Sequence, residues 1–281
     1  MDGLGGHEYE PVLDVTGWVS DVGDPRGARE KSWLLKPGRG VTDSQHLFKQ
    51  ARPHGKTPEH GSDLWAEVLA SRIARAIQVP AVHMDFAVRG STRGVISQRM
   101  SIDLTDGNEL LGGDRVADRG SESGYHLVAI RRALAGYQGS ERGLTAYESF
   151  VGHLILDALI ANTDRHSENW AVDLSRGELL PCFDHGASLG FNATEQQRAN
   201  VSRFASRGRS SPFGVSILEV AQRGLDSVTA DVADLWLGRV EALTFLALER
   251  LVERVPLGWM SDPSRTFVVG LVWENRRRLL G

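Results

Sequence analysis

The stretch N-T-D-R-H-S-E-N, Asn162–Asn169, decides the fold that we expect for this chain. It places the carboxylate of Asp164 five residues before the amide of Asn169. A second carboxylate, Asp184, follows fifteen residues after Asn169 and stands directly before a His-Gly pair. Two short apolar runs separated by Ser-Arg-Gly-Glu lie between them and predict a hairpin. Such a hairpin would bring Asn169 and Asp184 to the same end, facing one ion.

The spacing of these three side chains is that of a kinase catalytic loop followed by a metal-binding aspartate. Phosphoryl transfer needs a carboxylate that accepts or orients the proton of the attacking hydroxyl, and oxygen ligands that hold Mg²⁺ against the triphosphate. We therefore take Asp164 and Asn169 as candidate catalytic residues, and Asn169 and Asp184 as candidate metal ligands. An ordinary turn is also rich in Asn, Asp, Arg and Ser, so the rest of the chain must decide between the two interpretations.

The chain before residue 51 alternates predicted strands with polar loops. Residues 1–11 are Gly-rich and polar, and we expect them to be a flexible N-terminus. Strands are expected at 12–20, 32–36 and 46–50, with a Gly-, Pro- and charge-rich loop at 21–31. This order is typical of a kinase nucleotide-binding half, in which the first loop covers the phosphates and a strand lysine reaches them.

Lys49, on the third expected strand, is our candidate for that lysine, and Lys36 on the preceding strand is its competitor. Lys31 and Ser32, with backbone N–H groups of the preceding loop, are candidate phosphate contacts. A solvated hairpin loop is the alternative. An amphipathic helix is expected at 62–77, with Ser62 or Asp63 as its N-cap.

Glu67 lies in this expected helix, eighteen residues after Lys49 and beside the apolar face. A glutamate at that place suits the Lys–Glu pair that fixes the lysine in kinase-type sites. Two further strands are expected at 79–88 and 93–100. The second runs into Gln98, Arg99 and Met100, where a kinase has its hinge and the adenine meets the backbone.

From residue 101 to the end the chain is expected to be mainly helical. An apolar helix leads directly into Asn162, and three more helices are predicted at 215–224, 229–254 and 263–280. The segment 196–213 is rich in arginine and serine. It is either an activation or substrate-binding segment, with arginines available to phosphate or acidic partners, or a solvated basic loop.

Composition excludes several classes of protein. The chain has 281 residues, 41% hydrophobic and 24% charged, with a formal net charge of −4, which does not favour binding of nucleic acid through overall basicity. We find no apolar run long enough to span a membrane and no signal peptide. The single cysteine, Cys182, fits a reducing compartment, so a cytoplasmic protein is expected.

Taken together, the stretch Asn162–Asn169, the later Phe183-Asp184-His, the strand L-F-K-Q around Lys49 and the W-A-E of Glu67 resemble the HipA-like serine/threonine kinases, distant relatives of phosphatidylinositol kinases. The resemblance implies an α+β, two-lobed protein-kinase-like fold. The small lobe would hold an antiparallel sheet with one helix at 12–100, and the larger, mainly helical lobe would span 101–281.

The same resemblance implies ATP and Mg²⁺ as cosubstrates. Asp164 would be the catalytic carboxylate, Asn169 and Asp184 the metal ligands, and Lys49 the contact to the nucleotide phosphates. His166 would brace the loop beside the nucleotide. HipA toxins are longer, with an additional N-terminal subdomain and an antitoxin that binds DNA, so for this chain we expect a stand-alone kinase without that antitoxin.

Three other functions stay open at this point. His166 and His185, with Asp164 and Asp184, suggest a metal-dependent hydrolase, although this leaves Lys49 unexplained. A non-catalytic pseudokinase that binds ATP is the second. The third is a kinase whose acceptor is a small molecule or a lipid head group instead of a protein serine or threonine, because a fold does not select the acceptor.

Overall fold

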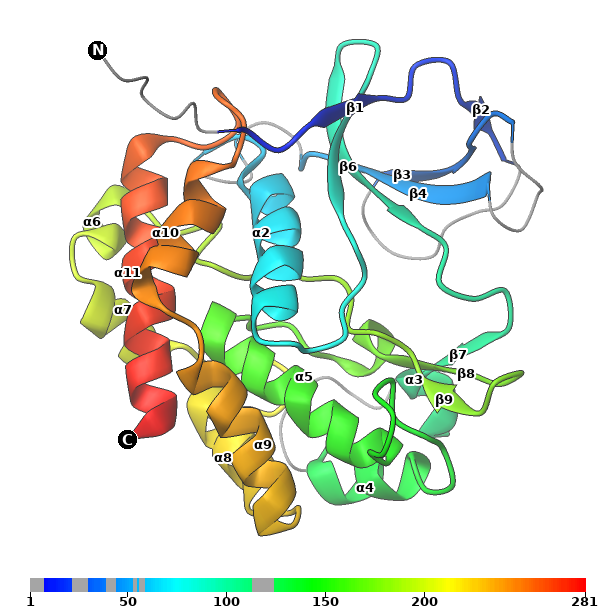
Figure 1. Cartoon of the computed structure of the whole chain (residues 1–281), viewed down its shortest axis with the longest axis vertical. Helices are drawn as coiled ribbons and strands as arrows, with labels where there is room; N and C mark the ends of the chain where they lie inside the picture. The colour runs from blue at the N-terminus through cyan, green and yellow to red at the C-terminus, as the bar shows by residue number, and fades with distance from the viewer. Residues whose placement is uncertain (1–7, 22–29, 39–43, 53–54, 56–58, 113–123) are drawn as a thin grey trace.

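The computed structural model describes residues 8–21, 30–38, 44–52, 55, 59–112 and 124–281. A mixed sheet built from the first third of the chain lies at one end of the molecule, and helices form the rest (Figure 1). The expected α+β class is confirmed. Within the described ranges, no helix combines the length and apolar character needed to cross a membrane.

The sheet has six strands in the order β1-β5-β6-β4-β3-β2, and every neighbouring pair is antiparallel except β1 with β5. One face encloses a small apolar cluster, and the opposite face packs on helix α2. The strands are β1 (Val12–Asp14), β2 (Val19–Ser20), β3 (Lys31–Leu35), β4 (Gln45–Gln50), β5 (Asp85–Arg89) and β6 (Thr92–Gln98).

Two expected strands are shorter than the sequence predicted. The strand expected at 12–20 is two strands at opposite edges of the sheet, because the carboxylate of Asp14 accepts from the backbone N–H of Thr16 at 2.9 Å and turns the chain there. The strand expected at 79–88 becomes regular only at Asp85, and Val82 before it bonds to the carbonyl of Cys182.

Helix α2 (Ser62–Ala76) lies between the sheet and the helical part, and thirteen of its fifteen residues are buried. The sequence had suggested Ser62 or Asp63 as the N-cap of this helix, and that prediction is wrong. Gly61 takes that position with a φ of 77°, a backbone conformation that glycine adopts without a steric cost. Both polar residues instead lie inside the first turn and are buried.

Helix α5 (Ala146–Ile160) is the centre of the remaining fold, because all its residues except Glu148 are buried. A capping box between Thr145 and Glu148 begins it, and Ala161 ends it in the left-handed conformation. A three-stranded sheet lies beside the loop that follows α5. Its strands are β7 (Leu104–Asp106), β8 (Ala171–Asp173) and β9 (Glu178–Leu179).

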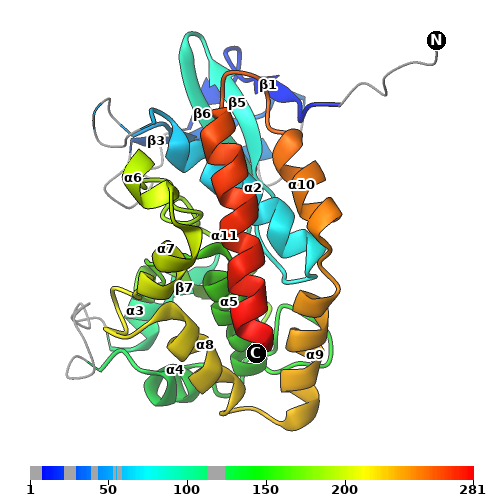
Figure 2. The same cartoon turned by 90° about the vertical axis from the view of Figure 1, so that its left-hand side faces the viewer.

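Helices α8, α9 and α11 pack on α5, and α11 runs along the helical part with α7 beside it (Figure 2). The short ones are α3 (Gly107–Leu110), α4 (Leu127–Ala133), the 3₁₀ turn η1 (Ser167–Asn169), α6 (Glu195–Arg198) and α7 (Val201–Arg207). The longer ones are α8 (Ile217–Leu225), α9 (Ala230–Glu241), α10 (Phe245–Glu253) and α11 (Asp262–Leu280).

The prediction of a single helix at 229–254 is wrong, because this segment forms two helices, α9 and α10. Thr244 caps α10 by accepting from the backbone N–H of Ala247 at 3.2 Å. Arg276 of α11 donates to the carbonyls of Val240, at 3.2 Å, and Glu241, at 2.5 Å. These side-chain bonds replace the hydrogen bonds that a continuous helix would have made.

The packing of α5 against α9 gives a test of this core. A Cβ added at Gly152 of α5 would lie 2.5 Å from the ring of Trp236, whereas one added at Gly238 of α9 would meet nothing within 4 Å. We expect Gly152→Ala to lower the free energy of unfolding by about 1–3 kcal/mol through overpacking. Gly238→Ala is the matched control and should raise it by up to about 1 kcal/mol. Urea denaturation checks both values, and equal effects at the two sites would contradict the packing described.

Candidate active site

Lys49, Glu67 and Asp184 come together although they lie far apart in the sequence. The Nζ atom of Lys49 is 3.0 Å from Oε1 of Glu67 and 3.2 Å from Oδ1 of Asp184. Glu67 is fully buried and Lys49 is 6% exposed, whereas the side chain of Asp184 is one-third exposed, at 33%. The expected pair of Lys49 with Glu67 is therefore present. The partly exposed carboxylate of Asp184 faces the same ammonium group.

Glu67 joins the sheet to the loop that carries Asp184. Its Oε1 accepts from Lys49 of β4, and its Oε2 accepts from the backbone N–H of His185 at 2.9 Å. Asp184 itself has a φ of 59°, a left-handed conformation that Asp tolerates better than most side chains. The burial of Glu67 in α2 thus fixes both the lysine and the backbone next to Asp184.

Asp164 and Asn169 lie in the loop that follows α5. The amide nitrogen of Asn169 donates to the backbone carbonyl of Asp164 at 2.5 Å, and the backbone N–H of Asp164 donates to the side chain of Asn162 at 3.2 Å. Asn169 is 4% exposed, whereas the carboxylate side chain of Asp164 is 47% exposed. The loop therefore holds its backbone rigidly and leaves the carboxylate of Asp164 accessible.

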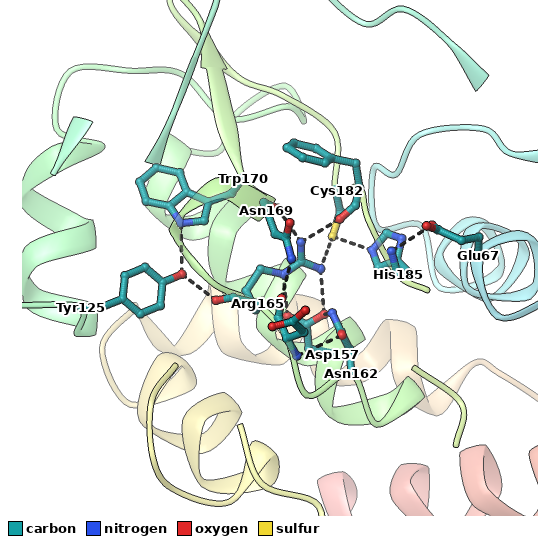
Figure 3. Close-up of polar contacts among 11 residues, drawn as sticks. Glu67, Tyr125, Asp157, Asn162, Arg165, Asn169, Trp170, Cys182 and His185 are labelled. Atoms are coloured by element: carbon teal, nitrogen blue, oxygen red, sulfur yellow. Dashed lines mark hydrogen bonds and ion pairs between the residues drawn. The ribbon is translucent and has the colours of Figure 1, made fainter. Parts of the chain in front are cut away.

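Arg165 is the residue that holds this loop against the helix, and sequence reasoning missed it. Its guanidinium forms a bidentate pair with Asp157 of α5, with both nitrogen–oxygen distances at 2.8 Å (Figure 3). It also donates to the carbonyl of Asn169 at 2.6 Å and to that of Phe183 at 3.0 Å. One side chain thus ties the Asn169 loop to the segment directly before Asp184.

Burial of the Arg165 guanidinium alone would lower its pKa, but the carboxylate of Asp157 outweighs this effect and raises the pKa above its ordinary value. The guanidinium therefore stays charged while buried. A signal for the pair was present in the sequence, because Asp157 is the one acidic residue in the second half of an otherwise apolar helix. A lone carboxylate at such a place needs a buried cation as its partner.

Cys182 and His185 extend this buried polar group (Figure 3). The Sγ atom of Cys182 lies 2.9 Å from the Arg165 guanidinium and 3.0 Å from Nε2 of His185. Burial raises the pKa of the Cys182 thiol to about 12 and holds the pKa of His185 well below its usual range. Both side chains are therefore neutral near pH 7.

The hydrolase interpretation needed His166 and His185 beside Asp164 and Asp184. The ring of His185 instead contacts Cys182, while Nδ1 of His166 accepts from the backbone N–H of Glu168 at 3.2 Å. Over the ranges that the structure describes, no three His, Cys, Asp or Glu side chains are grouped as metal ligands. His166 braces the loop, as expected, and its Nε2 lies 4.0 Å from the carboxylate of Asp164.

Lys31 and Ser32 lie on β3, directly opposite Lys49 and Phe48 of β4. Residues opposite each other in an antiparallel pair point to the same face of the sheet, so Lys31 lies on the face of Lys49. The Gly-rich loop before them falls on residues 22–29, outside the described part of the chain. The expected contact of this loop with phosphate stays a prediction.

The expected hinge residues lie where β6 ends. Gln98 pairs with His46 of β4, and the backbone N–H of Arg99 donates to the carbonyl of Gln45 at 2.9 Å. The guanidinium of Arg99 donates to the side chain of Gln45 at 2.7 Å. Arg99 therefore braces the end of the sheet, and Met100 follows it half-buried on the way to the helical part.

Comparison with known proteins gives one family and a shared fold. The sequence matches the family model of the HipA-like C-terminal domain over residues 24–236. A search of curated proteins found no match. Among solved structures, the chain is similar to the Helicobacter pylori proinflammatory kinase CtkA, with a TM-score of 0.70 and 15% identity over 96% of this chain and 95% of that one.

A second similar structure is HipA of Shewanella oneidensis MR-1, from a toxin–antitoxin complex with HipB and operator DNA. The TM-score is 0.55 and the identity 12%, over 92% of this chain and 65% of that one. The chain thus spans 65% of the length of that HipA chain, and the likeness in both cases is one of fold.

The buried pair of Arg165 and Asp157 gives a second test. Arg165→Met should lower the free energy of unfolding by about 3–5 kcal/mol, because it leaves the Asp157 carboxylate buried without its counter-charge. The double variant Arg165→Met/Asp157→Leu removes both charges, so its loss should be smaller than the sum of the two single losses. Denaturant unfolding of the four proteins measures this coupling, and additive losses would contradict the role of the pair.

Proposed function

The chain belongs to the HipA-like kinase family, and on that premise we propose that it is an ATP- and Mg²⁺-dependent kinase that phosphorylates a serine or threonine of a protein. The observation that carries this proposal is the convergence of Lys49, Glu67 and Asp184, with nitrogen–oxygen distances of 3.0 and 3.2 Å. A lysine held by a buried glutamate and facing a carboxylate is the arrangement that binds a nucleotide–metal complex.

In this proposal the chain works as two lobes with the nucleotide between them. Residues 12–100 form the nucleotide-binding lobe and residues 101–281 the helical lobe. Lys49 binds the phosphates, assisted by Lys31 and Ser32. The adenine meets the backbone at 98–100.

Asn169 and Asp184 offer Mg²⁺ the oxygen ligands that it prefers. The amide nitrogen of Asn169 is occupied by the carbonyl of Asp164, so its amide oxygen is the atom left to bind a cation. When bound, Mg²⁺ neutralises charge on the phosphate oxygens. The fit rests on the donor set itself, a carboxamide oxygen and a carboxylate oxygen on two segments that Arg165 ties together.

Asp164 is the proposed catalytic carboxylate, because it is exposed on a loop whose backbone is held from both sides. It orients the acceptor hydroxyl and receives its proton. The hydroxyl oxygen forms a bond to the γ-phosphorus, and the bond from that phosphorus to the bridging oxygen breaks. The products are ADP and a phosphoester, and Lys49 stabilises the charge that develops on the phosphates.

Substitution of the two key charges tests this function. We expect Lys49→Met and Asp164→Asn each to lower the rate of transfer from γ-labelled ATP by at least about 10²-fold, since each removes a group that acts on the reacting atoms. Lys36→Met and Glu168→Gln are the matched controls, because both residues are exposed and lie close in sequence to the residues tested. Circular dichroism and thermal unfolding would verify that each variant is folded.

Transfer at a near-normal rate by either Lys49→Met or Asp164→Asn would contradict the mechanism. Binding of ATP without hydrolysis or transfer by the unmodified protein would favour the pseudokinase instead. Transfer to a metabolite or a lipid head group, and to no protein, would instead favour a small-molecule or lipid head-group kinase. Incubation with Mg²⁺ and labelled ATP, with and without cell lysate, separates these results.

A further inference from the structure

A cavity of about 500 Å³ lies beside the proposed catalytic loop. Ala161 and Thr163, which precede Asp164, line one side of it, and Arg203, Phe204 and Arg207 of α7 line another. Its volume is within the range of cavities that bind small ligands or a few side chains. Its lining includes none of Lys49, Glu67 and Asp184, and it includes Thr163, the residue directly before Asp164.

The wall that carries the arginines is fixed relative to this loop. The backbone N–H of Ser211 donates to the carbonyl of Thr163 at 2.8 Å, so the segment after α7 is bonded to the residue next to Asp164. On the other side, Arg278 of α11 donates to the carbonyl of Ala205 at 2.6 Å, and the ring of Phe204 contacts that of Phe267 edge to face. The wall is therefore held both by the loop that carries Asp164 and by α11.

Arg203 and Arg207 lie one helical turn apart on α7, so their side chains lie on one face of the helix. Both are exposed, and neither forms an ion pair with any residue that the structure describes. Other arginines of the chain do have such partners: Arg198 is 3.6 Å from Glu59 and Arg239 is 2.5 Å from Glu141.

The remaining residues of the wall add no negative charge. A third arginine, Arg209, donates to the carbonyl of Gly214. The described residues that line the cavity include no Asp or Glu. Three positive charges thus face the cavity without a carboxylate among them, and an anion is the ligand chemistry that such a surface attracts.

We propose that this cavity binds the acceptor next to its hydroxyl, and that the acceptor is a peptide in which an acidic side chain accompanies the serine or threonine. The carboxylate is bound by Arg203 and Arg207, because a guanidinium forms two parallel hydrogen bonds with a carboxylate. This assignment rests on the proposed kinase function and names its substrate class.

Two further features of the lining favour a peptide over a free anion. Asn192 and Gln196 present side-chain amides, which both donate and accept and so match the N–H and C=O groups of a peptide backbone. Phe191 and Phe204 supply apolar surface for a neighbouring side chain. A site for a lone anion would need the arginines but not this mixed surface.

Matched peptides test the proposal. Each contains one serine and a single Glu at a different distance from it, and its control has Gln, which has nearly the same shape without the charge. With γ-labelled ATP, we expect at least about a tenfold higher kcat/KM for the best Glu peptide than for its Gln control. The ratio should fall toward one for Arg203→Ala/Arg207→Ala and stay unchanged for Arg132→Ala, an exposed arginine on α4 far along the chain.

Equal rates for Glu and Gln peptides, or a double variant that keeps the ratio, would overturn the proposal. So would arginine-dependent transfer to a free hydroxy acid such as malate without transfer to any peptide. A binding measurement keeps the two proposals apart: fluorescence anisotropy of the Glu peptide needs no catalysis. If the unmodified protein transfers no phosphate but binds the Glu peptide through these arginines, the proposed kinase function is contradicted and the proposed peptide-binding site is supported.

Discussion

The buried guanidinium of Arg165 is the interaction on which the site depends. It pairs with Asp157 of α5 at 2.8 Å and donates to the carbonyls of Asn169 and Phe183, which belong to two different segments. A buried charge is costly unless it is paired and its hydrogen bonds are satisfied, so these four acceptors make a single arrangement strongly preferred. The distance between the Asn169 loop and the Asp184 segment is therefore set by one side chain.

A second buried carboxylate, that of Glu67, fixes the position of the sheet relative to the Asp184 segment. Glu67 receives Lys49 on one oxygen and the backbone of His185 on the other, so the strand β4 and the segment after β9 are joined through α2. The exposed groups of the site, Asp164 and Asp184, each stand next to one of these buried supports. Rigid support under accessible carboxylates is what positioning of a phosphoryl group requires, because in such chemistry the protein contributes mainly geometry and charge.

The arginine-lined cavity includes residues of the same loop, Ala161 and Thr163, in its lining. Hydrogen bonds fix its position. The backbone N–H of Ser211 donates to the carbonyl of Thr163, and the guanidinium of Arg278 on α11 donates to the carbonyl of Ala205 on α7. A nucleotide site at Lys49, Asn169 and Asp184 and an acceptor site beside Thr163 would thus share the loop that carries Asp164. This arrangement would bring the two reactants to one carboxylate.

The sequence alone determined the local features: the α+β class, the strand with Lys49, the helix with Glu67, and the apolar helix that leads into Asn162. These follow from spacing along the chain, because periodicity and short turns depend on neighbouring residues. Only the tertiary structure decided that Asp157 pairs with Arg165, that 229–254 breaks into two helices with Thr244 capping the second, and that Arg203 and Arg207 face a cavity. Such features depend on which buried faces and charges meet across the fold, and spacing along the chain does not identify these partners.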